Sequence, residues 1–327
     1  MEIDIETSRI MGFADFLQSA AFDNFRQAYS QDPHIKENGP EIAEAFKELQ
    51  PLIQVDPNSQ TGELFTSLAL KAATGQLKSD DIDAFCDEMA KGLPNGMTPE
   101  QRAAMHTLYG AYSNFFDAHL DQMNLEASVL QSQARETFPE TMQEAADFIG
   151  YDIPDNYEAG AVIIPSPKGL GAHGRSIENE EGSRTQYAAI PVDSRNEPED
   201  TLITIFHEDV HKLFYDSGAY GKVSSELSTE EKPGQVTSDV NLFNEALAVL
   251  FQNKYCDKLG IDRRPYAEID NSEKGRAFDT EATRLEGLVN GGEKLFGADG
   301  KMSPNMKPFN QNVNVGIVKA LAERQAE

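Results

Sequence analysis

The chain has 327 residues, of which 39% are hydrophobic and 25% charged, so it can bury a sizeable core and is neither a disordered nor a fibrous protein. Lys and Arg total 28 against 55 Asp and Glu, and this formal net charge of -27 argues against nucleic acid or an anionic membrane as a partner. The acidity fits a salty environment, simple solubility or the steering of cationic peptides, and these alternatives stay open.

The amino-terminal segment has the features of neither a signal peptide nor a membrane anchor. Acidic residues stand where a signal peptide carries Lys or Arg, and no stretch of the chain approaches about eighteen uninterrupted apolar residues. We therefore expect a cytoplasmic protein, with export by a route that uses no signal left open. Cys86 and Cys256 lie far apart and outside any CxxC pattern, so each is expected to be a small core residue. The oligomeric state is not predicted.

Residues 1–150 are predicted to form an all-helical domain. Short breaks that contain Gly, Pro or Asn separate segments whose apolar residues repeat with a period of 3.6, and strands are not expected there. One helix should begin at Thr98, where Gln101 completes a capping box. A further helix is expected from about Pro139 to a stop at Gly150.

The residue pattern of the sequence changes near residue 150. The runs AGAVIIP and RTQYAAIPV are short, rich in Val, Ile, Tyr and Ala, and bounded by turn residues, as strands usually are. The sequence therefore predicts a mostly helical α+β protein. Its first domain covers residues 1–150, and its second, with a small sheet and a long helix, covers residues 151–327.

The segment from Asn196 to Gly218 is predicted to be a single helix. Asn196 is a plausible N-cap, Pro198 falls in the first turn, and Gly218 stops the helix. Apolar residues at helical spacing indicate one buried face, and His207 and His211, at positions i and i+4, lie along its edge. Both imidazoles therefore point the same way.

The stretch HEDVH in this helix is a complete H-E-x-x-H motif. Two neutral imidazoles one turn apart can bind a single Zn²⁺, and Glu208 projects beside them, where it can take a proton from the water that the metal activates. Asp209 is expected to face solvent. The structural alternative is a pair of buried histidines that bond to the backbone, beside a surface acid.

Zinc held by two histidines needs a third protein ligand. Ser217 and Phe214 stand where the metzincin pattern has His and Gly, which excludes that pattern. The next strong helix is expected from Ser238 and is apolar almost all round, so the lone carboxylate of Glu245 within it would be costly unless a positive charge meets it. A buried salt bridge or partial exposure of Glu245 is the alternative. Rival ligands are Glu226, Glu230, Glu231 and Glu268.

HEDVH followed by a helical Glu in FNEALAVLF resembles the gluzincin branch of the zincin metallopeptidases, over roughly the second half of the chain. The resemblance implies a zincin-like fold, a peptide or protein substrate, and Zn²⁺ bound by His207, His211 and Glu245. It implies Glu208 as the general base. Val249 stands where thermolysin-like members carry Asp, and the first half of the chain resembles no family that we can name.

Two other functions stay open: a non-catalytic zincin-like binding module, and a metal-dependent hydrolase of a non-peptide amide or ester. Gluzincin-like enzymes use a Tyr, His or Arg to stabilise the oxyanion, and no motif singles one out here. The candidates for that role are Tyr215, Tyr255, Tyr266, Arg263 and His173.

Overall fold

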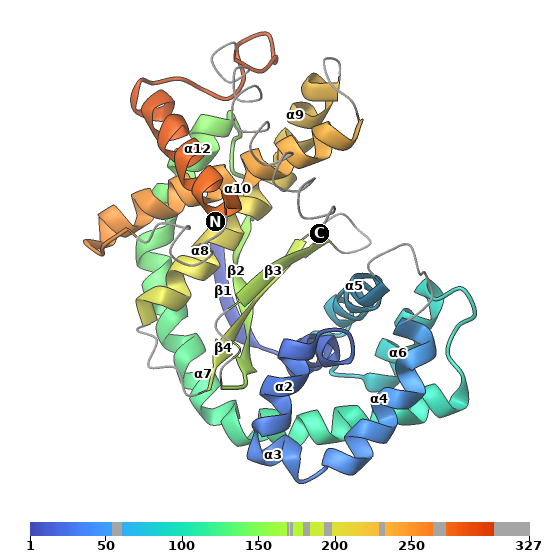
Figure 1. The fold of residues 1–327 in the computed structure, drawn as a ribbon. Coiled ribbons are helices and arrows are strands. Elements are labelled where there is room, and N and C mark those ends of the chain that lie inside the picture. Colours follow the sequence, from blue (N-terminus) through green and yellow to red (C-terminus); the bar gives the residue numbers. More distant parts are fainter. Residues whose placement is uncertain are drawn as a thin grey trace. The chain divides into compact units, whose positions relative to one another are not determined.

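A computed structural model describes residues 1–53, 61–168, 170, 173–178, 184–192, 198–228, 233–263 and 273–303. The elements in chain order are β1 (Glu2–Thr7), α1 (Arg9–Phe16), the 3-10 helix η1 (Leu17–Ala20), α2 (Asp23–Gln31), α3 (Pro33–Lys36), α4 (Gly39–Ile53), α5 (Thr61–Thr74), α6 (Ile82–Gly92), α7 (Pro99–Ile149), β2 (Glu158–Ser166), β3 (His173–Glu178), β4 (Arg184–Pro191), α8 (Pro198–Asp216), α9 (Ala219–Ser228), α10 (Pro233–Leu259) and α12 (Glu273–Asn290) (Figure 1). The predicted class, mostly helical α+β, is confirmed. Within the described ranges, no helix is both long and apolar enough to cross a bilayer.

The described strands form one mixed sheet in the order β1-β2-β4-β3. Strands β2 and β4 are parallel, with Val162 opposite Tyr187, whereas β3 runs antiparallel to β4. The expectation of no strand before residue 150 is wrong at β1. Its residues Ile3 and Ile5 are buried between exposed neighbours, which is the period of two that a half-buried strand requires.

Helix α7 begins as the sequence predicts, with a reciprocal capping box. The Thr98 backbone N–H donates to Gln101 Oε1 at 2.9 Å, and the Gln101 N–H donates to Thr98 Oγ1 at 3.2 Å. The helix ends where predicted, before Gly150, whose φ of 78° is the left-handed conformation that glycine adopts without strain.

The prediction of a separate helix from about Pro139 is wrong, because α7 continues through that residue as one helix of 51 residues (Figure 1). A proline inside a helix removes one backbone hydrogen bond and crowds the preceding turn. The buried face of α7 continues on both sides of Pro139, since Ala134, Phe138 and Met142 are fully buried at successive intervals of four residues. Continuous apolar packing along this face therefore outweighs the local cost of the proline.

The described chain divides into two compact units, each assembled from separated stretches. Unit 1 comprises Met1–Ile3, Gln133–Ala159 and Phe206–Glu327, and unit 2 comprises Asp4–Ser132 and Gly160–Ile205. The chain passes from one unit to the other within β1, α7, β2 and α8. Each unit combines stretches that are far apart in the sequence, and the sheet likewise joins β1 to strands that follow α7.

Unit 2 contains a buried carboxylate, Asp15, which is 0% exposed. Its Oδ1 accepts from Gln18 Nε2 at 2.7 Å and from the Tyr187 hydroxyl at 3.0 Å, and it lies 3.0 Å from His173 Nε2. The Tyr29 hydroxyl donates to Oδ2 at 3.4 Å. Asp15 therefore links α1 to η1, α2, β3 and β4 within this unit.

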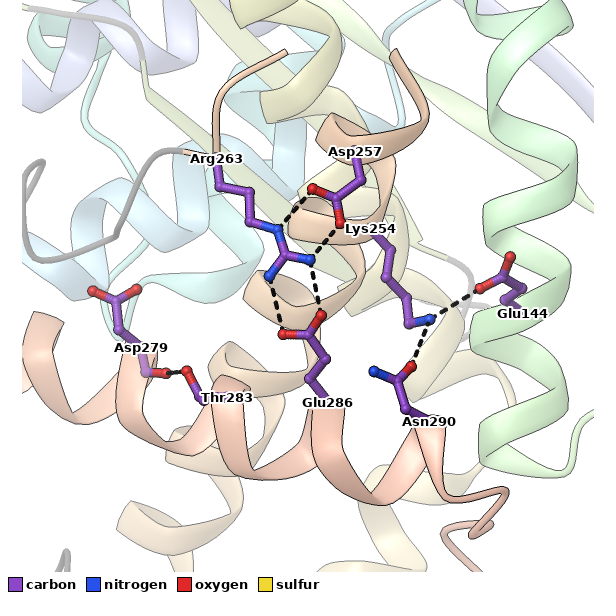
Figure 2. A network of polar contacts seen from close by, with 8 residues as sticks. All are labelled: Glu144, Lys254, Asp257, Arg263, Asp279, Thr283, Glu286 and Asn290. Atoms are coloured by element: carbon purple, nitrogen blue, oxygen red, sulfur yellow. Dashed lines mark hydrogen bonds and ion pairs between the residues drawn. The ribbon is translucent and has the colours of Figure 1, made fainter. Parts of the chain in front are cut away.

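In unit 1, ion pairs join α10 to its neighbours on the surface (Figure 2). The Arg263 guanidinium donates to both carboxylate oxygens of Asp257 and, at 3.0 and 2.8 Å, to both of Glu286. Lys254 donates to Glu144 on α7 at 3.4 Å. These pairs hold the end of α10 against α7 and α12.

Candidate metal centre

The two histidines of the HEDVH motif lie on α8, which spans Pro198–Asp216. Asn196 lies outside the described residues, while Gly218 follows the helix with a φ of 72°, as a stop residue should. His207 is 8% exposed and His211 6%. Their Nε2 atoms are 3.1 Å apart, so the i, i+4 spacing aims both imidazoles at one point, as predicted.

Glu245 on α10 completes a group of three donors. Its Oε2 lies 3.6 Å from His207 Nε2 and 3.6 Å from His211 Nε2. Donor atoms bound at about 2.0–2.1 Å to one tetrahedral Zn²⁺ stand about 3.3 Å apart. The three separations bracket that value, so these side chains could hold one metal ion of this size. Within the described ranges, this is the one group of at least three His, Cys, Asp or Glu that could hold a metal.

The electrostatics of this group favour a positive charge where the three donors meet. Burial alone would lower the pKa of His211, but the Glu245 carboxylate, helped by Glu208, raises it to about 9. Burial alone would raise the pKa of Glu245, but the two imidazoles lower it well below its ordinary value. Glu245 thus stays ionised, and a proton or a metal ion supplies the opposite charge.

The remaining nitrogens of the two imidazoles face side chains of α10. His207 Nδ1 lies 2.8 Å from Gln252 Oε1, which accepts its proton and leaves Nε2 as a lone pair. His211 Nδ1 and Asn244 Oδ1 are both buried and have no hydrogen-bond partner within bonding geometry among the described residues. A metal on His211 Nε2 would place a proton on Nδ1, which a nearby carboxamide oxygen can accept. A proton on His211 Nδ1 therefore suits both a metal-loaded His211 and the protonated ring that its raised pKa favours without metal.

Glu208 is half-buried beside the three donors rather than among them. Its charge contributes to the raised pKa of His211, which places its carboxylate within electrostatic reach of the site. The expectation that Asp209 faces solvent is wrong, because its side chain is 0% exposed. Residues on two sides of α8 are therefore buried. Burial, together with the charge of Asp209, raises the pKa of the Tyr157 hydroxyl. The spacing of apolar residues along one helix cannot show that a second side of that helix is buried.

Of the rival ligands, Glu226 is the one that lies within the described residues. Glu226, on α9, is not among the three clustered donors. The other three rivals, Glu230, Glu231 and Glu268, lie outside the described residues.

Three of the candidates for oxyanion stabilisation have other polar partners in the structure. Tyr255 is buried, with its hydroxyl 2.7 Å from Thr137 Oγ1, and Arg263 is held by two carboxylates. His173 lies in unit 2 beside Asp15, and Tyr266 is outside the described residues.

Tyr215 is the candidate that lies on α8 itself, one turn beyond His211. It stacks on Tyr220 of α9, with ring centroids 4.5 Å apart. Sequence reasoning did not single out Tyr220, whose hydroxyl donates at 3.1 Å to Asn241, one turn before Glu245 on α10. No motif marks this position, so only the packing of α8, α9 and α10 reveals it.

No family model matches the chain, and comparisons with curated proteins and with solved structures find no similar protein. The gluzincin resemblance therefore depends on the HEDVH motif and the downstream Glu245. The geometry of the three donors adds an observation that is independent of any family.

Proposed function

We propose that this chain is a zinc-dependent metallopeptidase. The observation that carries the proposal is the convergence of His207, His211 and Glu245, whose donor atoms are separated by 3.1 and 3.6 Å, with Glu208 beside them. Two imidazoles and one carboxylate form a common three-ligand catalytic zinc set, which leaves a fourth position open.

The mechanism assigns separate tasks to the four side chains. His207, His211 and Glu245 would hold the ion, which supplies Lewis acidity toward a water molecule and the scissile carbonyl. Glu208 removes the proton from the attacking water and delivers it to the leaving amine. The half-buried Glu245 keeps a negative charge at the site, because the two buried imidazoles hold its pKa well below the ordinary value.

The choice of a peptide substrate rests on the gluzincin resemblance, and the choice of hydrolysis on the position of Glu208 next to a metal ligand. A purely structural histidine pair would need neither a third donor at 3.6 Å from both rings nor a half-buried carboxylate one residue after His207. The strongly acidic chain offers nothing that favours a nucleic-acid substrate.

The test pairs metal analysis with cleavage of an unbiased peptide library. We expect about one zinc per chain. His207→Ala should lose most of the metal, whereas Glu208→Gln should keep the metal and the fold and lower turnover by about 10² to 10⁴-fold. Normal turnover in zinc-loaded Glu208→Gln would remove the residue from the base role. Zinc without peptide cleavage would favour a binding module or a non-peptide hydrolase.

A further inference from the structure

Gln252 contacts the outer nitrogen of a candidate zinc ligand, His207. Its Oε1 is 2.8 Å from His207 Nδ1, and the residue is 6% exposed. We propose that Gln252 is a positioning residue of the metal centre: it fixes the ring orientation and the tautomer in which His207 presents Nε2 to the ion. This inference rests on the proposed zinc site.

The number of protons on an imidazole determines which of its nitrogens can bind a metal. A neutral imidazole carries one proton, and its two nitrogens then act as one donor and one acceptor. Because a carboxamide oxygen only accepts, Gln252 Oε1 keeps the proton on His207 Nδ1 and the lone pair on Nε2. Rotating the ring by half a turn would bury Nδ1 without this acceptor, at the cost of an unsatisfied polar group.

The helical repeat ties this support to the third donor. Glu245 and Gln252 are seven residues apart on α10, close to two full turns, so both side chains project from the same face of the helix. One element therefore supplies a metal donor and also orients the partner donor on α8. A shift of α10 along α8 would disturb both contacts together.

The neutral charge of Gln252 separates this arrangement from one with a carboxylate acceptor. A carboxylate at the outer nitrogen would raise the basicity of the imidazole and add a negative charge near the ion. The three donors carry one negative charge, that of Glu245. Gln252→Glu should therefore keep the hydrogen bond and bind zinc at least as tightly as the unmodified chain.

The competing explanation is that Gln252 only fills space between α8 and α10. Gln252→Met separates the two explanations, because it preserves the length of the side chain and removes the acceptor. Asn253→Ala is the matched control: it removes the neighbouring carboxamide, whose Oδ1 is buried and makes no hydrogen bond to either histidine.

The experiment measures zinc affinity by chelator competition, and the ring N–H of His207 by NMR of the zinc-loaded chain with ¹⁵N-labelled histidine. We expect Gln252→Met to weaken zinc binding by about 10 to 100-fold and to lose the exchange-protected ring N–H signal. Gln252→Glu should restore both, and Asn253→Ala should change neither. If Gln252→Met does not fold, Gln252→Asn, which withdraws the acceptor by one methylene, carries the same comparison.

Two results would overturn the inference while leaving the proposed function intact. One is unchanged zinc affinity with an unchanged ring N–H signal in Gln252→Met. The other is a Gln252→Glu variant as weak as Gln252→Met, which would make packing rather than the acceptor decisive. Failure of the unmodified chain to bind zinc would instead overturn the proposed function, and this inference with it.

Discussion

Zinc binding to this chain should depend steeply on pH, because the metal has to displace a proton from His211. Burial opposes that proton, but Glu245 and Glu208 raise the pKa of His211 to about 9 in the absence of metal. Below that pH, each unit of acidification should lower the apparent association constant about tenfold. Between pH 9 and pH 7 the loss amounts to about 100-fold, or about 2.7 kcal/mol.

The assay is chelator competition between pH 6 and pH 10, together with calorimetry at pH 7.5 in buffers of different ionisation enthalpy. We expect the release of about one proton per zinc ion bound, since a ligand must be deprotonated before it binds. Glu245→Gln removes the charge that raises the pKa of His211, so the steep region should move toward the ordinary histidine value of 6.5.

The metal-free chain provides a second readout of the same shift. A raised pKa contributes stability that is fully present below the unfolded value of 6.5 and is lost as pH rises through about 9. The His211 contribution to the free energy of unfolding should therefore fall between those values. Zinc affinity that stays flat between pH 7 and pH 9, with no proton release, would show that zinc binding does not displace a proton from His211.

Three further predictions concern single side chains. Glu245→Ala should weaken zinc binding by about 10² to 10³-fold, because one of three protein ligands is lost. The control variant Glu226→Ala should leave zinc binding unchanged in the same chelator competition. The reverse result would move the third ligand away from α10. Asp15→Ala should lower the free energy of unfolding by about 3–5 kcal/mol in urea titrations, since it removes the acceptor shared by several buried donors, and a loss under about 1 kcal/mol would contradict this. Arg263→Ala should cost about 1 kcal/mol, because its ion pairs are partly exposed, and should leave zinc affinity unaltered; impaired zinc binding would show that the residue acts on the metal centre.

Features that depend on local geometry can be predicted from the sequence. The i, i+4 spacing of His207 and His211 brings two imidazoles together on any helix, and the apolar period predicts that helix. The capping box at Thr98 and the stop at Gly150 are equally local, because each involves backbone groups within one turn. The mostly helical α+β class follows from the same periodicities.

Features that depend on what lies next to each element emerge from the packing of the fold. The burial of Asp209 requires cover on a second side of α8, and the continuity of α7 through Pro139 requires packing that outweighs a local cost. The sequence suggested Glu245 from its solitary charge, but its distance of 3.6 Å from both imidazoles is set by the packing of α10 on α8. The Gln252 contact joins residues 45 positions apart and left no pattern in the sequence, because a hydrogen bond between two helices has no period along either one.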